Sequence, residues 1–318
     1  MTQVGSGADV VSGLVNSPFG KAFVIANARA GKGARHPDEF EKILAGAGLD
    51  FDLHVTERRH HAVELARQAI DDGWTYLVAV GGDGTIHEVV NGMMGDGGPR
   101  NRDAVLGIVS AGSGSDFVRT FGLPDDASHG VEHLTGDGFV DIDLGRVTFT
   151  TEGGESTEWF PNIAEAGLGA DVAKVAERLP RRLGRSRYLV GFWITLARFK
   201  GTEGTVVCDT RTYEGRITNL VVANGQFFGG GMHVAPKATP TDGRLDVLIQ
   251  IGTKADYIAA ITKVFKGKHI PSPAIKEYKA RRVEVTTKKP LRVEADGELL
   301  GMTPATFQLY ENALRLKV

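Results

Sequence analysis

The sequence has a single cysteine, Cys208, among 318 residues. One cysteine excludes an intramolecular disulfide and a zinc site built on thiolates, and it fits a protein of the reducing cytoplasm. Long hydrophobic runs are also lacking, because no stretch reaches the roughly 18 apolar residues of a membrane-spanning helix. We therefore expect a cytoplasmic protein whose contact with a membrane, if it makes one, is peripheral at the inner face.

An excess of charge of one sign is missing as well. The chain has 37 Lys and Arg residues against 39 Asp and Glu residues, a formal net charge of −2. General nucleic-acid binders are usually strongly basic, so this charge argues against a nucleic-acid partner. Residues 1–20 contain no Lys or Arg and no sustained apolar core, so they are not a secretory signal. Their glycines and serines predict a flexible tail.

The pattern that is present changes character near residue 145. Short apolar runs at 21–27, 51–56, 76–80 and 105–110 alternate with helical patterns, which predicts an α/β domain with a parallel sheet over 21–145. From 146 to 318, many short β runs, among them 159–164, 306–309 and 314–318, predict a β-rich sandwich domain. Helices are expected near 171–178, 188–199 and 255–265. The last strand is a candidate to pack back on the first domain.

The most informative stretch is a glycine turn after the third predicted strand. Gly81, Gly82 and Gly84 remove three side chains in four positions, and a helix capped by Thr85 is expected to follow. A strand, a glycine turn and a helix N-terminus together bring backbone N–H groups close to phosphate. Asp83 lies inside this turn and would repel phosphate, so a metal ion or a transferred proton is its expected partner. The alternative is a tight turn in which Asp83 is merely a cap.

Other polar residues follow predicted strands. Asn27, Thr56 and the second glycine turn at 112–116 share this position with the first turn, so all are expected at one edge of the sheet. The P-loop and dinucleotide fingerprints are absent. Arg29 and Lys32 either help to hold phosphate or are simply solvated.

The second half contains polar turns of its own. Asp242 and Asp246 flank one glycine turn, where Asp242 could bind a hard cation such as Mg²⁺, and Asp296 and Glu298 flank another. An ordinary hairpin is the alternative for each turn. A glycine cluster at 229–231 predicts backbone lying against a ligand or the other domain. The arginine-rich run 178–187 leads into an apolar helix and is either a solvated loop or an edge that meets an anionic membrane.

Taken together, the chain resembles the diacylglycerol kinase catalytic-domain family, which includes bacterial soluble diacylglycerol kinases, related bacterial lipid kinases, and sphingosine and ceramide kinases. The family's first domain is similar to that of NAD kinases. The ordered motifs that carry the resemblance are Asn27 with Ala30-Gly31, Thr56, 81–85 with Glu88 and Asn91, 112–116 with Phe117 and Arg119, Asn162 with Gly167, Gly169 and Asp171, 223–225 with 229–231, 242–246, and 296–298.

The resemblance implies a lipid kinase that transfers the γ-phosphoryl group of ATP to a lipid hydroxyl, most simply that of diacylglycerol. It implies ATP and Mg²⁺ as cofactors. Independently of the resemblance, an exposed β edge in the second domain makes a homodimer one possible assembly. The general base maps to Asp296 or Glu298, with Asp83 as a further candidate or as an organiser of the nucleotide's Mg²⁺. A structural Mg²⁺ maps to Asp242 with the carbonyl groups of Thr239 and Arg244. The implied ATP contacts are Asn27, Thr56, Gly81, Gly82, Asp83, Gly84, Thr85, Ile86, His87, Gly112 and Ser113.

The chain departs from the family pattern at three of these positions. Ser113 replaces a threonine, Ser115 replaces an asparagine, and His87 replaces an asparagine in the helix that follows the first glycine turn. Two other functions therefore remain open, a soluble-substrate kinase such as an NAD kinase and a nucleotide- or lipid-binding regulator that has lost catalysis.

Overall fold

The structure is a computed structural model that describes residues 17–27, 37–111, 114–125, 131–180, 183 and 186–318. The predicted tail therefore lies almost wholly outside the described residues. So do several residues that the sequence singles out, namely Arg29, Ala30, Gly31, Lys32, Gly112, Ser113, Arg181, Arg182 and Arg185.

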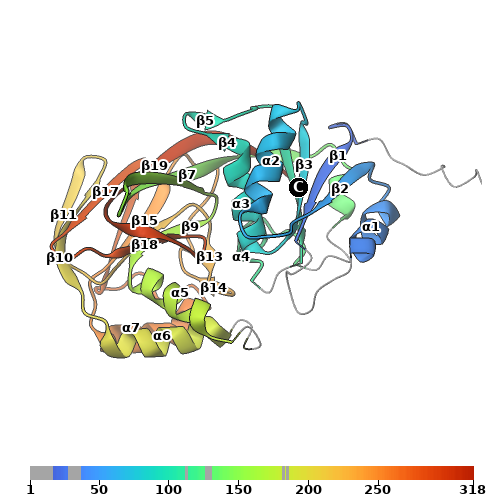
Figure 1. The fold of residues 1–318 in the computed structure, drawn as a ribbon. Coiled ribbons are helices and arrows are strands. Elements are labelled where there is room, and N and C mark those ends of the chain that lie inside the picture. Colours follow the sequence, from blue (N-terminus) through green and yellow to red (C-terminus); the bar gives the residue numbers. More distant parts are fainter. Residues whose placement is uncertain (1–16, 28–36, 112–113, 126–130, 181–182, 184–185) are drawn as a thin grey trace, which may run out of the picture.

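The first half is a parallel sheet with helices on both faces (Figure 1). Its strands, in the spatial order β6-β3-β1-β2, are β1 (Ala22–Ala26), β2 (Phe51–Val55), β3 (Tyr76–Gly81) and β6 (Val105–Ser110). The helices are α1 (Pro37–Gly46), α2 (His61–Asp71), α3 (Asp83–Met93) and α4 (Asp116–Thr120). Side chains of α2 and α3 pack on one face of the sheet, and those of α1 pack on the other. Covered on both faces, β1, β3 and β6 are buried throughout, as their continuous apolar runs require.

Small elements complete this half. A short hairpin follows α3, and a single 3-10 turn precedes the second half. Their bounds are β4 (Met94–Gly95), β5 (Gly98–Pro99) and η1 (Glu132–Leu134).

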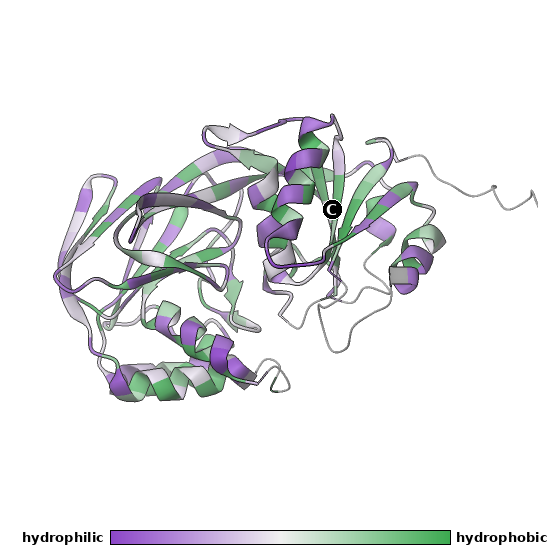
Figure 2. Ribbon diagram, viewed as in Figure 1, coloured by the Kyte–Doolittle hydropathy of each residue, from purple (hydrophilic) through white to green (hydrophobic). Residues whose placement is uncertain are grey.

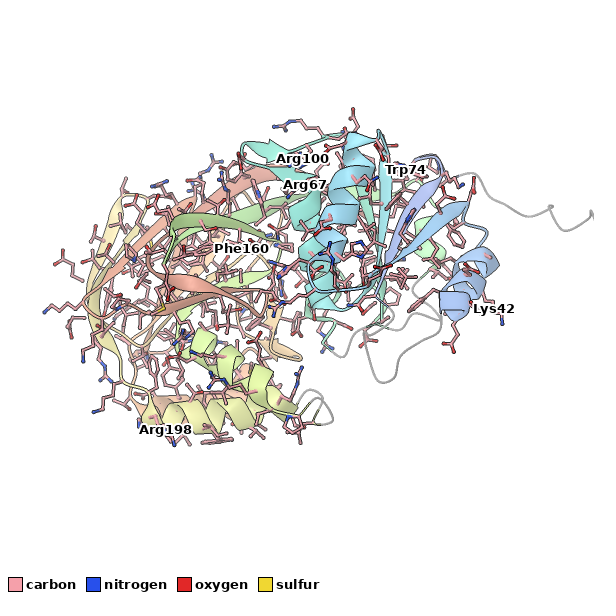
Figure 3. All side chains as sticks on the ribbon, in the orientation of Figure 1. Lys42, Arg67, Trp74, Arg100, Phe160 and Arg198 are labelled. Atoms are coloured by element: carbon pink, nitrogen blue, oxygen red, sulfur yellow. The ribbon has the colours of Figure 1, made fainter. Side chains whose placement is uncertain are left out.

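The second half is rich in antiparallel strands. Their bounds are β7 (Phe139–Thr151), β8 (Gly154–Phe160), β9 (Ile163–Gly167), β10 (Thr202–Cys208), β11 (Arg211–Ile217), β12 (Asn219–Ala223), β13 (Phe227–Phe228), β14 (Met232–His233), β15 (Leu245–Gln250), β16 (Ile275–Ala280), β17 (Arg282–Thr287), β18 (Arg292–Ala295) and β19 (Glu298–Lys317). Their inward side chains form a second core, in which Phe160 and Phe307 meet edge to face. Phe160 is labelled in Figure 3. Helices α5 (Leu168–Arg178), α6 (Ser186–Arg198) and α7 (Lys254–Val264) lie together beside this sheet (Figure 1).

Two long strands join the halves. β19 runs antiparallel to β7 and then pairs in parallel with β6, where Arg315 lies opposite Val105. One 15-stranded sheet therefore spans both halves. β7 passes without a break through Gly145, where the sequence predicts the domain boundary. Gly145 is required there because a Cβ would overlap the ring of Phe160.

Several predicted strands differ from the observed ones. The predicted strand 159–164 is two strands, β8 and β9, because the chain bends at Asn162, whose side chain donates to the carbonyl of Phe227. The predicted strands 306–309 and 314–318 are both part of β19. Strands β11 and β16 were not predicted, because their sequences are largely polar and lack an apolar run.

The close packing of α2 on α3 depends on Gly92. A Cβ at this position would lie 2.5 Å from the carbonyl oxygen of Val63 and 2.6 Å from the Cβ of Ala66. We expect Gly92→Ala to lower the free energy of unfolding by about 1–3 kcal/mol, the usual cost of overpacking. Urea denaturation followed by circular dichroism measures the difference.

Gly46 provides the control for this substitution. It ends α1, and nothing lies within 4 Å of the place that a Cβ would take. Gly46→Ala should leave stability unchanged or raise it by about 0.5 kcal/mol, since alanine favours the helix. Equal effects of the two substitutions would contradict the packing argument.

Candidate functional site

The first glycine turn lies at the end of β3 and leads directly into α3. The helix begins at Asp83 with Gly82 as its N-cap, so the prediction that Thr85 caps the helix is wrong. Thr85 instead lies in the first turn, below Gly81, where a glycine is needed because a Cβ would overlap the threonine side chain. Its Oγ1 accepts a hydrogen bond of 3.3 Å from Nδ2 of Asn27. The turn thereby presents the start of α3 at the edge of the sheet.

The other strand-end residues lie at the same edge. The amide of Asn27 donates to the carbonyl of Val80 at 2.9 Å, and that of Thr56 donates to the carbonyl of Ala26 at 2.9 Å. After β6, the amide of Ala111 donates to the carbonyl of Gly81 at 2.8 Å. The structure therefore brings together the predicted residues of this edge that it describes.

The carboxylate of Asp83, a half-buried residue, lies near a second carboxylate, that of the buried Asp116. Oδ1 of Asp83 accepts a hydrogen bond of 3.1 Å from the amide of Phe117 in α4. Burial and the nearby charge of Asp116 raise the pKa of Asp83 to about 6, although backbone hydrogen bonds oppose this shift. Gly114 has no room for a side chain, because a Cβ there would overlap Oδ2 of Asp83. A cation brought to this position would relieve the repulsion between the two carboxylates.

Asp116 fastens the glycine cluster of the second half to the first half. Its two oxygens accept hydrogen bonds of 2.7 Å from the amides of Gly230 and Gly231. Both glycines have positive φ angles, 91° and 101°, which place these neighbouring amides toward the carboxylate. The predicted contact of this cluster with the other domain is thus made through Asp116.

The acidic turn at 296–298 approaches α3 from the second half. Asp296 has a left-handed backbone, with φ of 50°, and its side chain is 3% exposed. Its Oδ1 accepts from the amide of Ile163 at 2.9 Å, and its Oδ2 lies 3.0 Å from Nδ1 of His87. The carboxylate is therefore held in one position. It is also close enough to Asp83 for its charge to contribute to the raised pKa of that group.

His87 lies between two carboxylates and does not face the glycine turn. Its Nε2 is 3.2 Å from Oε1 of Glu158, while its Nδ1 contacts Asp296. Burial alone would lower the pKa of His87, but the hydrogen bonds and charges of Asp296 and Glu158 raise it to about 10. The side chain is thus committed to Asp296 rather than to a nucleotide, unlike the expectation from the sequence. Ile86 is 1% exposed in the core, which leaves only its backbone for such a contact.

Glu298 differs from Asp296 in exposure. Its side chain is 29% exposed and pairs with Arg59, from the segment that follows β2. A Cβ at Gly84 would lie 3.9 Å from its Oε1, so this carboxylate stands close to the start of α3. Arg59, which is 59% exposed, thus places a mobile positive charge at the same edge.

Two buried glutamates lie behind the acidic turn, and sequence reasoning missed both. Glu165 on β9 and Glu294 on β18 are direct cross-strand neighbours, 5% and 0% exposed. Burial raises the pKa of each, and the charge of Glu165 adds to the shift of Glu294. Two such neighbouring carboxyl groups do not ionise together, so at least one of them stays protonated. Each glutamate interrupts an apolar run in the sequence, and this interruption could have indicated a buried acid.

These glutamates connect the acidic turn to an apolar cavity. Oε2 of Glu294 accepts a hydrogen bond of 2.7 Å from the amide of Gly297, and Glu165 lines a cavity of about 330 Å³. The cavity lies between the sheet, the hairpin β13–β14 and helices α5, α6 and α7. Its apolar lining includes Leu168, Val172, Leu189, Phe192, Phe228, Met232, Ile261 and Val264.

In the loop predicted to hold a structural Mg²⁺, the ammonium group of a lysine already pairs with the carboxylates. Nζ of Lys279 lies 2.6 Å from Oδ2 of Asp242 and 3.2 Å from Asp246. The amide of Arg244 donates to Oδ1 of Asp242, and the carbonyl of Thr239 accepts from the amide of Asp242. Among the described residues, no three His, Cys, Asp or Glu side chains group as metal ligands do. A Mg²⁺ bound by Asp242 would have to displace the ammonium group of Lys279, so the site at Thr239, Asp242 and Arg244 stays a prediction.

Comparisons with known proteins agree with this architecture. The diacylglycerol kinase catalytic domain family matches residues 21–147, and the YegS C-terminal NAD kinase beta sandwich-like domain family matches residues 162–318. The putative lipid kinase YtlR of Bacillus subtilis (strain 168) is 31% identical over 315 residues, which cover 93% of this chain and 98% of that protein. The diacylglycerol kinase of the same strain is 28% identical over 292 residues, which cover 90% and 92%.

A solved structure has the same fold. A putative diacylglycerol kinase from Bacillus anthracis str. Sterne superposes with a TM-score of 0.75 at 23% identity, over 95% of this chain and 98% of that one. Together with the sequence matches, this confirms the predicted resemblance and the predicted fold class. None of the helices in the described part of the chain is long and apolar enough to cross a bilayer.

The link between His87 and Asp296 should be visible in the pH dependence of stability. Because folding raises the pKa of His87 from 6.5 to about 10, its contribution is complete below pH 6.5 and is lost as the pH rises toward 10. We expect His87→Asn to lower the free energy of unfolding by about 3 kcal/mol near pH 6.5, where the imidazolium is bound by two carboxylates. Urea denaturation across the window measures the difference.

His60→Asn is the matched control. His60 is exposed and has a left-handed backbone, with φ of 61°, which asparagine tolerates well. Its effect on stability should be small and constant across the same pH range. A loss in His87→Asn that does not change between pH 6.5 and 10 would exclude a buried imidazolium.

Proposed function

The chain belongs to the diacylglycerol kinase catalytic-domain family of lipid kinases, and from this premise we propose that it transfers the γ-phosphoryl group of ATP to the hydroxyl group of diacylglycerol. One observation carries the proposal. The acidic turn of the second half reaches α3 of the first half, where Asp296 contacts His87 and its charge acts on Asp83, and an apolar cavity adjoins this turn. A kinase that acts on a lipid needs this combination of an anion-binding helix end, a proton acceptor and an apolar site.

The phosphates of ATP would lie over the first turn of α3. The start of the helix carries its positive partial charge, although the amides of Thr85 and Ile86 already donate to the carbonyl of Gly82. Gly81, Gly82 and Gly84 keep side chains away from this approach. The exposed guanidinium of Arg59 would add a second positive group by leaving Glu298 for a phosphate.

The carboxylates of Asp83 and Asp116 fit the Mg²⁺ that accompanies ATP. They are hard oxygen donors, and the charge of Asp116 already disfavours the ionised form of Asp83. Mg²⁺ usually combines one or two carboxylates with phosphate oxygens, so a site made of protein side chains alone is not required. When bound, the ion would neutralise charge on the phosphates.

Asp296 is the proton acceptor in this proposal. Its carboxylate is fixed by Ile163 and His87, whereas that of Glu298 is shared with a flexible arginine. Fixed geometry favours proton transfer, because the acceptor must lie within hydrogen-bond reach of the reacting hydroxyl group. His87 would then be a positioning residue for Asp296 and would stabilise its negative charge.

The cavity supports a lipid as the acceptor of phosphate. Its wall is mostly apolar, and it adjoins the acidic turn through Glu165 and Glu294. Acyl chains placed there would leave the glycerol hydroxyl group near Asp296.

Asp296→Asn should lower kcat by roughly 10²- to 10⁴-fold, the usual contribution of a general base. The measurement is transfer of ³²P from labelled ATP into an organic-extractable product, with diacylglycerol in mixed micelles. Binding of ATP, measured by calorimetry, should be nearly unchanged, since this residue is not assigned to the nucleotide.

Asp52→Asn is the control, because this aspartate forms an exposed ion pair with Lys21 away from the site. It should keep full activity. Folded protein that binds ATP but phosphorylates no hydroxylated lipid would refute the proposal. Formation of NADP from NAD in the same assay would identify a soluble-substrate kinase instead.

A further inference from the structure

Helix α6 carries an apolar stripe on its solvent side. Leu189, Val190, Trp193 and Ile194 follow one face of the helix and are between 37% and 45% exposed. The opposite face packs on α5, where a Cβ at Gly191 would lie 3.1 Å from a backbone oxygen. A surface helix normally turns its apolar stripe inward, so this arrangement is inverted. The apolar character of α6 is visible in Figure 2.

Helix α7 extends this surface. None of its residues is buried, and Ile258 is 51% exposed. Phe265, which directly follows the helix, is 50% exposed. Nζ of Lys254 donates to the carbonyl of Ala197 at 2.5 Å and ties the start of α7 to α6. We refer to the exposed apolar residues of both helices as the docking face, namely Leu189, Val190, Trp193, Ile194, Ile258 and Phe265.

The docking face is continuous with the apolar cavity. Leu189 and Phe265 belong to both, and other cavity residues come from the inner sides of the same two helices. A molecule that enters the cavity from this side must therefore first cross the docking face, where large apolar side chains point outward. Most of the large exposed hydrophobic residues described in the chain lie here.

The charges around the docking face are mainly positive. Its exposed basic neighbours are Arg198, Lys200, Lys254, Lys263, Lys266 and Lys268, and Figure 3 shows Arg198 at the end of α6. The acid on α7, Asp256, is occupied as the capping partner of Thr253. A second copy of the chain on this face would oppose like charges, whereas anionic headgroups would complement them.

We propose that the docking face binds the surface of a bilayer that contains anionic phospholipids. The apolar side chains enter the boundary between headgroups and acyl chains, and the lysines bind the phosphates above it. The helices then lie in the plane of the membrane, with the cavity opening toward the lipid. This binding goes beyond phosphoryl transfer and requires neither ATP nor catalysis.

Cosedimentation with vesicles tests the proposal. The wild-type protein should bind vesicles of phosphatidylcholine mixed with phosphatidylglycerol more tightly than vesicles of phosphatidylcholine alone. The double variant Trp193→Ser, Ile194→Ser should weaken binding to the mixed vesicles by roughly tenfold or more, because two large apolar side chains no longer leave water. These residues are exposed, so circular dichroism should show an unchanged fold.

A charge variant separates the two contributions. Lys266→Glu together with Lys268→Glu should abolish the preference for the anionic vesicles, since each lysine near such a surface contributes roughly fivefold. Phe139→Ser is the control for exposure alone, because Phe139, at the start of β7, is 41% exposed and contacts Phe19 rather than α6 or α7. It should bind vesicles as the wild type does.

Three results would overturn the proposal. They are wild-type protein that sediments with neither vesicle, a docking-face variant that binds as well as the wild type, and a wild-type dimer that this variant converts to monomers in the absence of lipid. The last result would assign the face to a second copy. Phosphorylation of a short-chain substrate without vesicles should survive in the docking-face variant, so a failure of docking is distinguishable from a failure of the proposed kinase activity.

Discussion

The structure depends on the burial of three carboxylates, those of Asp83, Asp116 and Asp296, around the start of α3. Water would stabilise each charge, and burial removes most of that solvation. The chain compensates with its own donors, since backbone amides bind each of the three and the ring of His87 binds Asp296. Moving these donors away would leave buried charges without hydrogen bonds, which costs free energy. The carboxylates therefore determine how closely the two halves of the molecule approach one another.

This compensation explains the unusual backbone of the region. Gly230, Gly231 and Gly297 have positive φ angles, and Asp296 adopts the left-handed region without being a glycine. Each conformation directs an amide or a carboxylate that the charge balance needs. The buried glutamates Glu165 and Glu294 lie farther from the edge of the sheet and need compensation as well. There a bound proton neutralises a carboxyl group that water cannot reach. The apolar cavity and the acidic turn are thus parts of one arrangement.

The sequence predicts what depends on local pattern. The parallel sheet follows from its continuous apolar runs, and the clustering of Asn27, Thr56 and the first glycine turn follows from the geometry of parallel strands. The sequence does not reveal contacts between distant residues, such as the one between His87 and Asp296. No repeating pattern of neighbouring residues encodes a contact between the two halves. The sequence does not predict strand β16, because a strand at the edge of a sheet requires no apolar run. The cation of Lys279 at Asp242 likewise depends on a neighbouring strand, β16, that brings it there.

Strand β19 has a consequence for the order in which the molecule can form during synthesis. β6 is made with the first half, but one of its neighbours in the sheet is the pair of residues Arg315 and Leu316, which are made only after nearly all of the second half. Until then, that side of β6 has unpaired N–H and C=O groups that could bind another nascent chain. The first half therefore remains incomplete until the second half has been made. A cell that makes this protein must protect an open strand edge for that interval.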